Sequence, residues 1–533
     1  VICAPGFGGL NLEGEDVVPA AQFAKVAENL FFDKSGRLSA RKGFTQLLEE
    51  TGVNKVESIF VLDNAQQRLV IFAGNSKIFI TNAGFNAAYD ITGSLSITAN
   101  QWQFQMFASN GAVNTPSTAF KVVGAQAGHQ LIEYELPANF PTSTGAFTAV
   151  AHGSQTVSDD NALCSAFGRL WAATDNGRVI EYSQLLAVDF TGNDSGVINI
   201  LANESALRSG FDSITAIHAL EDNLVVFLKD SIVVWDSPEA PGSLSIVKTV
   251  QGVGYVARDS VQQVGNDLVF LSRDGLRSLR KSLVEANFGL TDLSRPVRTQ
   301  FLIDVANKED VIRSAYYPED GIYILLIPGG ANGKCYVFDF KRRFEDGMPR
   351  VTTWTAPHWN SIYYHQGDLF VGHDDRIGTY ASYFDHNGTS DEVPYIMRYL
   401  SLNVDFDTPR LKMLKRFNMI VQGSPNQLMS ATSAFDFSGS LTSSSVGIPA
   451  TSTISEFQET DTAASLIHEF CSDAEVDAGT FAQFGSGAET HELAGTLAGS
   501  GEVVALGVES SVQGRPVAIE QLTYYATQGR FAR

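Results

Sequence analysis

A hairpin pattern recurs along residues 69–380: a short apolar run, a tight polar turn and a second apolar run. Six copies lie at residues 69–80, 170–182, 224–235, 268–279, 322–340 and 369–380. Several turns contain Gly-Asn, Asn-Gly or Asp-Gly, which adopt positive φ at low cost, as primed hairpin turns require. The pattern therefore predicts antiparallel hairpins through most of the chain.

The spacing of these hairpins predicts how they are arranged. From residue 170 onward, successive copies begin 54, 44, 54 and 47 residues apart. One four-stranded blade of a β-propeller takes roughly 40–50 residues. We therefore expect a mainly-β fold with a β-propeller-like body and few short helices.

Two segments have helical rather than strand-like patterns. In residues 19–30, Phe23, Val26, Ala27 and Leu30 fall on one helical stripe behind an early proline, so a helix is expected there. In residues 294–305, Ser294 is a plausible N-cap, Pro296 suits the first turn, and Val297, Phe301, Leu302 and Val305 share a face.

These patterns divide the chain into three parts. Residues 1–55 form an N-terminal segment that is not a blade, residues 56–390 form the propeller-like body, and residues 391–533 form a C-terminal β domain. Strand-like runs occupy 399–406, 414–421 and 517–525, while Ser, Thr, Gly and Ala dominate 423–500. This composition favours a β-sandwich with long loops over disorder.

The charge of the chain limits its partners. The 533 residues carry 59 acidic and 37 basic side chains, a net charge of −22 that is spread along the sequence. Such a surface repels phosphate backbones and anionic membranes, so tight DNA binding is not expected. The apolar runs are shorter than the ~20 residues of a membrane helix, so no membrane-spanning segment is predicted.

The termini and cysteines give little further information. The first ten residues lack the basic and apolar parts of a signal peptide, although native residues can precede Val1. Cys3, Cys164, Cys335 and Cys471 are far apart and have no metal-site spacing. We interpret them as reduced, scattered cysteines rather than a disulfide framework or a zinc site.

Several motifs resemble catalytic signatures but lack the residues that the chemistry needs. Residues 329–335 have the wrong spacing for a phosphate-binding loop and precede a strand, so we interpret them as a hairpin turn. His468-Glu and His491-Glu each lack the second histidine of a zinc-protease helix. No nucleophile elbow is present, and paired carboxylates cannot be chosen from sequence.

Two sets of residues could bind a metal ion. His358, His365 and His373, with Asp368, Asp374 and Asp375, fall within 18 residues, but strand alternation is expected to send them to different faces. The acidic loops at 189–195 and 473–477 lack the ligand spacing of a known Ca²⁺ loop. We therefore predict no catalytic residue, no metal site, no cofactor and no enzyme activity.

Aromatic and basic residues also have structural explanations. Trp102, Trp171, Trp235, Trp354 and Trp359 all lie near expected strands, so we expect core packing rather than a ligand platform. Arg37, Arg41 and Lys42 form a small basic cluster. That cluster can contact an acidic neighbour or lie in a solvated turn.

A series of phrases in one order resembles a known family. They are residues 27–44, 101–111, 168–183 with Asp189-Phe190 following, 211–232, 252–254 and 293–297. In this order they resemble the tail nozzle proteins of short-tailed bacteriophages, a family that includes tail tubular B-type and packaged-DNA-stabilisation proteins. The resemblance covers about residues 10–380. The C-terminal part is similar only in being rich in β structure and in its final Gly-Arg strand exit.

The resemblance implies a structural virion protein. In that family, propeller-like subunits form a six-fold ring below the portal and its adaptor, near the tail fibres or spikes. The ring retains packaged DNA and conducts it during ejection, without specific binding. Two alternatives stay open: an extracellular propeller that binds or cleaves carbohydrate, and a scaffold propeller that binds proteins through its faces.

Overall fold

The structure is a computed structural model of the chain. It describes residues 2–3, 7–14, 17–18, 22–33, 35–50, 52–63, 67–98, 101–109, 120–151, 161–174, 177–199, 212–236, 238–254, 257–280, 292–341, 343–344, 347–386, 392–424, 427–449 and 489–531. Contacts divide the chain into two compact units. Unit 1 comprises Val1–Gly9, Glu15–Lys42 and Glu392–Arg533, and unit 2 comprises Leu10–Gly14 and Gly43–Asp391.

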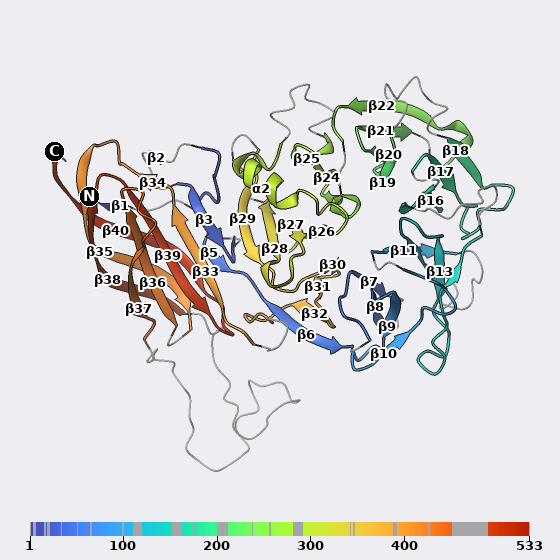
Figure 1. The fold of residues 1–533 in the computed structure, drawn as a ribbon, viewed down its shortest axis with the longest axis horizontal. Helices are drawn as coiled ribbons and strands as arrows, with labels where there is room; N and C mark the ends of the chain where they lie inside the picture. Colours follow the sequence, from blue (N-terminus) through green and yellow to red (C-terminus); the bar gives the residue numbers. More distant parts are fainter. Residues whose placement is uncertain are drawn as a thin grey trace, which may run out of the picture. The chain divides into compact units, whose positions relative to one another are not determined.

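Unit 2 is a β-propeller whose described strands form seven successive antiparallel sheets (Figure 1). The first three sheets are β7 (Ser58–Asp63), β8 (Arg68–Gly74), β9 (Lys77–Thr81) and β10 (Ala88–Asp90); β11 (Gln103–Ala108), β12 (Phe120–Ala125), β13 (Ile132–Glu135) and β14 (Thr148–Ala149); and β15 (Ala162–Ala166), β16 (Arg169–Thr174), β17 (Val179–Tyr182) and β18 (Gly196–Asn199). The mainly-β, propeller-like fold is therefore as predicted.

The remaining four sheets continue in chain order. They are β19 (Ile214–Leu220), β20 (Asn223–Leu228), β21 (Ser231–Asp236) and β22 (Ser245–Gln251); β23 (Gln262–Val264), β24 (Asp267–Ser272) and β25 (Gly275–Ser278); β26 (Arg313–Tyr317), β27 (Ile322–Ile327), β28 (Lys334–Asp339) and β29 (Arg350–Thr355); and β30 (Ser361–His365), β31 (Asp368–Gly372) and β32 (Arg376–Tyr380), completed by β6 (Phe44–Glu49). Short 3₁₀ helices lie at η2 (Pro241–Ser243), η3 (Arg258–Ser260), η4 (Arg295–Val297) and η5 (Gly330–Asn332).

The innermost strands form the ring of the propeller. Strands β7, β11, β15 and β19 contact one another in that order, as do β23, β26, β30 and β7. A buried apolar cluster joins the fourth and fifth sheets through Ala216, Phe227, Val261 and Phe270. Apolar side chains between neighbouring sheets therefore form the core.

Strand β6 closes the seventh sheet. It precedes the first sheet in sequence, yet it pairs with β32, from Phe44 opposite Tyr380 to Glu49 opposite Arg376. The last sheet thus combines strands from both ends of unit 2, which covers the outer edge of β32. Residues 43–55 therefore group with the body, although the sequence placed them in a separate segment.

All six predicted hairpins are confirmed, as the second and third strands of their sheets. The turn between β8 and β9 places Asn75 and Ser76 at φ of 51° and 57°, as a primed turn requires. In the second sheet, the sequence interpretation missed the corresponding hairpin, β12–β13, whose turn lacks an Asn-Gly or Asp-Gly pair. Residues 329–335 contain η5 and join β27 to β28, so the hairpin-turn interpretation is confirmed.

One predicted helix is present and the other is not. Helix α2 (Arg298–Val305) follows η4 and buries Phe301 and Val305. Ser294 stands at the start of η4, but its hydroxyl bonds Asp292 instead of capping the helix. The helix expected at residues 19–30 is wrong, because β3 (Ala24–Glu28) pairs with β33 and β4 (Leu30–Phe32) pairs with β5.

Unit 1 is a β-sandwich, as expected of a C-terminal β domain. One sheet contains β4, β5 (Leu38–Ala40), β40 (Ala518–Phe531), β35 (Arg410–Gly423) and β38 (Glu489–Gly501), with β1 (Ile2–Cys3) beside β40. The other contains β2 (Val17–Val18), β3, β33 (Tyr395–Ser401), β34 (Asn403–Val404), β36 (Leu428–Phe435), β37 (Thr442–Gly447) and β39 (Val504–Val512). The Tyr524 hydroxyl on β40 donates to Thr432 O across the sandwich, at 3.3 Å.

Part of the small-residue region lies outside the description. Residues 450–488 are not described, and they include the acidic loop at 473–477, His468 and Cys471. The helices of the described residues are too short and too polar to cross a membrane.

Candidate functional site: the axial cavity of the propeller

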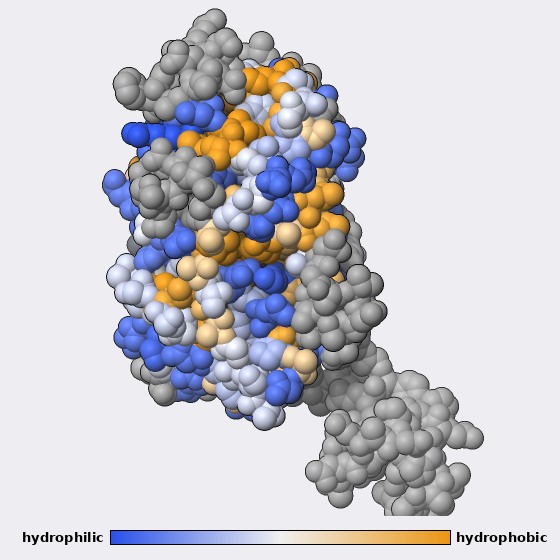
Figure 2. Space-filling model, turned by 90° about the vertical axis from the view of Figure 1, so that its right-hand side faces the viewer, coloured by the Kyte–Doolittle hydropathy of each residue, from blue (hydrophilic) through white to orange (hydrophobic). Residues whose placement is uncertain are grey.

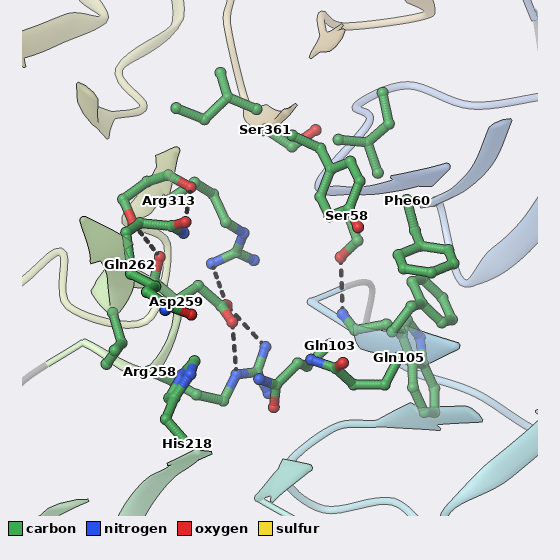
Figure 3. A pocket seen from close by; sticks show the side chains of 18 residues that line it. Ser58, Phe60, Gln103, Gln105, His218, Arg258, Asp259, Gln262, Arg313 and Ser361 are labelled. Atoms are coloured by element: carbon green, nitrogen blue, oxygen red, sulfur yellow. Dashed lines mark hydrogen bonds and ion pairs between the residues drawn. The ribbon is translucent and has the colours of Figure 1, made fainter. Parts of the chain in front are cut away.

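A polar cavity lies among the innermost strands of unit 2 (Figure 3). Its volume is about 310 Å³. Residues from six of the seven sheets or the loops leading into them line it, including Ser58, Phe60, Gln103, Gln105, His218, Arg258, Asp259, Gln262, Arg313 and Ser361. Because innermost strands surround it, the cavity occupies the axis of the propeller.

An ion cluster of Arg258, Asp259 and Arg313 dominates this cavity. The carboxylate of Asp259 accepts from Arg258 Nη2 at 2.9 Å and Nε at 3.1 Å, and it pairs with Arg313 Nη1 at 3.0 Å. Asp259 belongs to η3, while Arg313 begins β26. The cluster therefore connects the fifth and sixth sheets through charge-assisted hydrogen bonds.

The two guanidinium groups also bind backbone carbonyls of other sheets. Arg258 donates to Gln101 O at 2.7 Å and to Asn161 O at 3.3 Å, just before β11 and β15. Arg313 donates to Glu57 O at 3.3 Å, just before β7. One cluster thus anchors the starts of the first, second and third sheets to the fifth and sixth.

Neighbouring hydrogen bonds connect further sheets around the axis. Trp102 N donates to Ser58 Oγ at 2.8 Å, and Leu163 N donates to Gln103 Oε1 at 2.9 Å. Ser361 Oγ donates to Val56 O at 2.9 Å. These bonds satisfy polar groups that burial would otherwise leave unpaired. They indicate that much of the axial polarity stabilises the fold.

Burial and charge act in opposite directions on the titratable groups here. Burial alone raises the pKa of Asp259. The charges of Arg258 and Arg313 outweigh this effect, so the pKa of Asp259 lies below its usual value. Burial lowers the pKa of Arg313, with Asp259 opposing that shift. Burial also lowers the pKa of His218 to about 4, against the attraction of Asp259. The cluster is therefore ionised and His218 neutral at pH 7.

A wider mouth opens beside the axial cavity and shares Arg258 and Asp259 with it. This mouth has a volume of about 500 Å³ and is lined by loops that lead into the inner strands. Gln126, Lys229, Glu309 and Asp310 contribute side chains of mixed charge. Charges of both signs give no preference for an anionic polymer such as DNA.

The cavity has the size of a small-molecule site, and its charged residues are held in ion pairs. Among the residues that the structure describes, the lining contains one histidine and no cysteine, and its carboxylate is held by two arginines. General acid–base chemistry needs a titratable group free to exchange a proton with a substrate. The arrangement can anchor strands and bind a small polar molecule.

The sequence interpretation missed the axial residues. Arg258, Asp259 and Arg313 belong to no motif, because the two arginines are 55 residues apart in the chain. The sequence signal that could have pointed to the axial cluster was the adjacent Arg258-Asp259 pair before a strand. Such a pair is also common at solvated turns. Long-range pairing of this kind becomes visible in the fold and not in local spacing.

The histidine-rich set behaves differently from the expectation. His358 and His373 were expected on different faces, yet their rings stack with centroids 5.4 Å apart, and Asp374 binds His358 Nδ1 at 2.6 Å. His365 lies apart and contacts Asp63 at 3.3 Å, while Asp368 pairs with Arg68 at 2.7 Å. Another histidine, His386, joins the cluster, its ring 4.8 Å from that of His373. No group of three side chains in the described ranges is arranged to hold a metal ion.

The other candidate residues have structural roles. In the 189–195 loop, Asp189 accepts from Thr191 N and Thr191 Oγ1, both at 2.7 Å, which ties the loop together. His491 lies on β38, a strand and not a protease helix. All five tryptophans are buried, as core packing predicts. Burial raises the pKa of Cys164 to about 12, so this thiol is inert at neutral pH.

The basic cluster at residues 37–42 is not a solvated turn. Arg41 is fully buried, donates to Asn29 Oδ1 at 2.9 Å and lies over the Tyr395 ring at 4.3 Å. Arg37 pairs with Asp33 at 2.6 Å. Both arginines therefore fix strands of unit 1.

Comparisons with known proteins give few leads. No family model matches the chain, and no curated protein matches it in sequence. A crystal structure of the computationally designed Ika8 protein covers 63% of this chain and 98% of its own, with 11% identity and a TM-score of 0.33. A chain of a Mitotic Checkpoint Complex structure covers 62% and 89%, with 10% identity and a TM-score of 0.38. The Neurospora crassa Pan2 WD40 domain covers 63% and 94%, with 9% identity and a TM-score of 0.36.

Proposed function

We propose that this chain is a structural component of a short-tailed bacteriophage tail. In this role it builds the nozzle ring below the portal and adaptor, beside the tail fibres or spikes. The ring consists of several copies, with six expected from the resemblance. It retains packaged DNA in the virion and conducts it during ejection.

The ordered series of sequence phrases along residues 10–380 is the observation that carries this proposal. Each phrase is short, and it is their order along the chain that resembles the nozzle family. The propeller of unit 2 is compatible with it, because four of the phrases reach strands of that propeller. The axial cavity supports a structural role, since its charged residues hold strands together.

Net charge supports the passage of DNA without retention. Each lysine or arginine that binds a phosphate must later release it, and such contacts slow the movement of DNA. A chain with a net charge of −22 offers DNA little electrostatic attraction. We therefore expect no tight DNA binding and no hydrolase activity.

The outer strands offer surface for contacts between copies. Val197 on β18 is exposed, as are Ile246 and Val247 on β22. Five of the seven residues of β22 are exposed; Thr249 and Val250 are not. Figure 2 shows this side of the molecule, where apolar side chains gather in small patches between hydrophilic ones. Exposed apolar residues on an edge strand are typical of surfaces that another chain covers.

Mass and images of the purified chain test the proposal. Analytical ultracentrifugation and negative-stain microscopy should show a ring with a central hole. Duplex DNA should pass through a filter-binding assay unretained at about 150 mM salt. A stable monomer that binds or cleaves glycans would contradict the nozzle and favour the extracellular carbohydrate protein.

A further inference from the structure

Three histidine rings meet where the propeller closes. His358 precedes β30, His373 lies in the turn between β31 and β32, and His386 follows β32. Ring centroids lie 5.4 Å apart for His358 and His373, and 4.8 Å apart for His373 and His386. His373 is therefore the centre of this histidine cluster.

His373 is buried against aromatic rings. The residue is fully buried, and neither Nδ1 nor Nε2 has a hydrogen-bond partner. Phe44 of β6 packs against it with ring centroids 5.2 Å apart, and also contacts His386. Burial removes water from this ring and therefore favours its neutral form.

Charged and titratable groups around the cluster act on His373 in both directions: burial lowers its pKa, Asp374 raises it, and His386 and His358 lower it. On its own turn, the carboxylate of Asp374 is bound by His358 Nδ1 and by Asn360 Nδ2. From β32, Arg376 contacts His386 Nε2 and pairs with Asp375 at 2.8 Å and, more distantly, with Glu49 of β6. The buried Asp385 lies beside His386 in the chain, where its Oδ1 faces Gly43. A proton on His373 would thus add a cation between two further histidines and near Arg376.

The turn that carries His373 also forms backbone hydrogen bonds with the chain after β6. Besides the ladder of β6 with β32, Val56 N donates to His373 O at 3.0 Å and Glu50 N donates to Asp375 O at 2.7 Å. Gly43 allows a close approach, since a Cβ there would lie 1.8 Å from Phe384 O. Movement of the turn that carries His373 and Asp375 would therefore disturb the chain that follows β6.

We propose that the His358–His373–His386 cluster is an acid-sensitive clasp: protonation of His373 releases β6 from β32 and opens the propeller at its seventh sheet. The inference stands on the geometry of unit 2 and does not depend on the phage role. Its direction follows from linkage. Burial lowers the pKa of His373 to about 4, so the closed state binds this proton less readily than the open state. Opening is therefore favoured as pH falls from about 6.5 to about 4.

Hydrogen exchange of the full chain tests the clasp. Amide protection factors of β6, corrected for the intrinsic pH dependence of exchange, should fall by up to about tenfold per pH unit between pH 6.5 and 4.5. The amides of β16, inside the third sheet, whose described strands contain no histidine, should lose less protection over the same range. His373→Phe, which keeps an aromatic ring but cannot titrate, should remove most of the slope in β6.

A control variant and a comparison of two strands in the wild type separate the clasp from other effects of pH. His365→Phe changes a histidine of the same sheet outside the cluster, so it should leave the slope of β6 unchanged. Protection of β6 that does not vary with pH, or a slope that persists in His373→Phe, would overturn the clasp. If His373→Phe does not fold, the wild-type comparison decides: equal slopes in β6 and β16 would indicate global unfolding and overturn the proposal.

Discussion

The propeller contains two buried polar clusters that are built on opposite principles. At the axis, Arg258, Asp259 and Arg313 are charged, and ion pairs and backbone carbonyls satisfy them. At the closing sheet, His373 is neutral and its ring nitrogens have no partner. The first cluster depends on keeping its charges, whereas the second depends on staying uncharged. The stability of the propeller should therefore respond to mutation at the axial cluster and to pH at the closing sheet.

Removing the axial carboxylate should have the largest effect. Asp259→Asn leaves two guanidinium groups without their counter-charge, and breaking a buried pair costs about 3 kcal/mol or more. All five tryptophans lie in unit 2, so urea unfolding followed by tryptophan fluorescence reports on this unit. A loss below about 1 kcal/mol at pH 7 would show that the axial cluster does not anchor the sheets.

Acid should destabilise the propeller through its neutral histidines. Burial lowers the pKa of both His218 and His373 to about 4, while an unfolded histidine titrates near 6.5. The unfolded chain thus binds more protons between these values, so stability is complete above about pH 6.5 and falls toward pH 4. Each ring contributes roughly 2–3 kcal/mol to this loss. Urea midpoints of His218→Phe and His373→Phe should each depend less steeply on pH than the wild type, and unchanged slopes would contradict the assignment.

Replacing an axial arginine by lysine should have an intermediate effect. Arg313→Lys keeps a positive charge beside Asp259. It loses the planar guanidinium group, which also donates to Glu57 O and Ile312 O. We expect a loss of about 1–2 kcal/mol by the same fluorescence assay, since one or two hydrogen bonds are lost. A variant as stable as the wild type would mean that charge alone, without the carbonyl contacts, holds the axis.

An exposed pair in the same propeller gives the smallest expected effect. Asp230 and Arg273 pair at 2.7 Å, but their side chains are 54% and 61% exposed. Asp230→Asn should cost less than about 1 kcal/mol, and the cost should shrink in 0.5 M salt because solvent and ions screen the pair. A loss as large as that of Asp259→Asn would remove the distinction between buried and exposed pairs.

Local pattern predicted the hairpins well, because each depends on a few turn residues and two adjacent apolar runs. The β12–β13 hairpin was missed since residues 126–130 lack an Asn-Gly or Asp-Gly turn. Residues 24–28 showed a helical stripe, but pairing with β33, far along the chain, makes them a strand. Periodicity is a weak guide where a short segment can satisfy its backbone in a distant sheet.

The two polar clusters show the limit of sequence reasoning about sites. His358, His373 and Asp374 were recognised as neighbours in the chain, but turns, rather than strand alternation, set the direction of these side chains; His358 has φ of 60°. The contribution of β6 could not be inferred, because Phe44 lies more than 300 residues from His373 in the chain. Spatial convergence across a closed ring depends on topology that no local motif encodes.

A three-dimensional reconstruction of the intact virion tests the proposed function most directly. The account predicts six copies of this chain in a ring below the portal and adaptor, around a channel at least as wide as duplex DNA. A closed ring of this kind requires head-to-tail contacts between subunits. Two-fold pairing of the copies, a channel permanently too narrow for DNA with no movable gate, or the absence of this chain from the tail would contradict it.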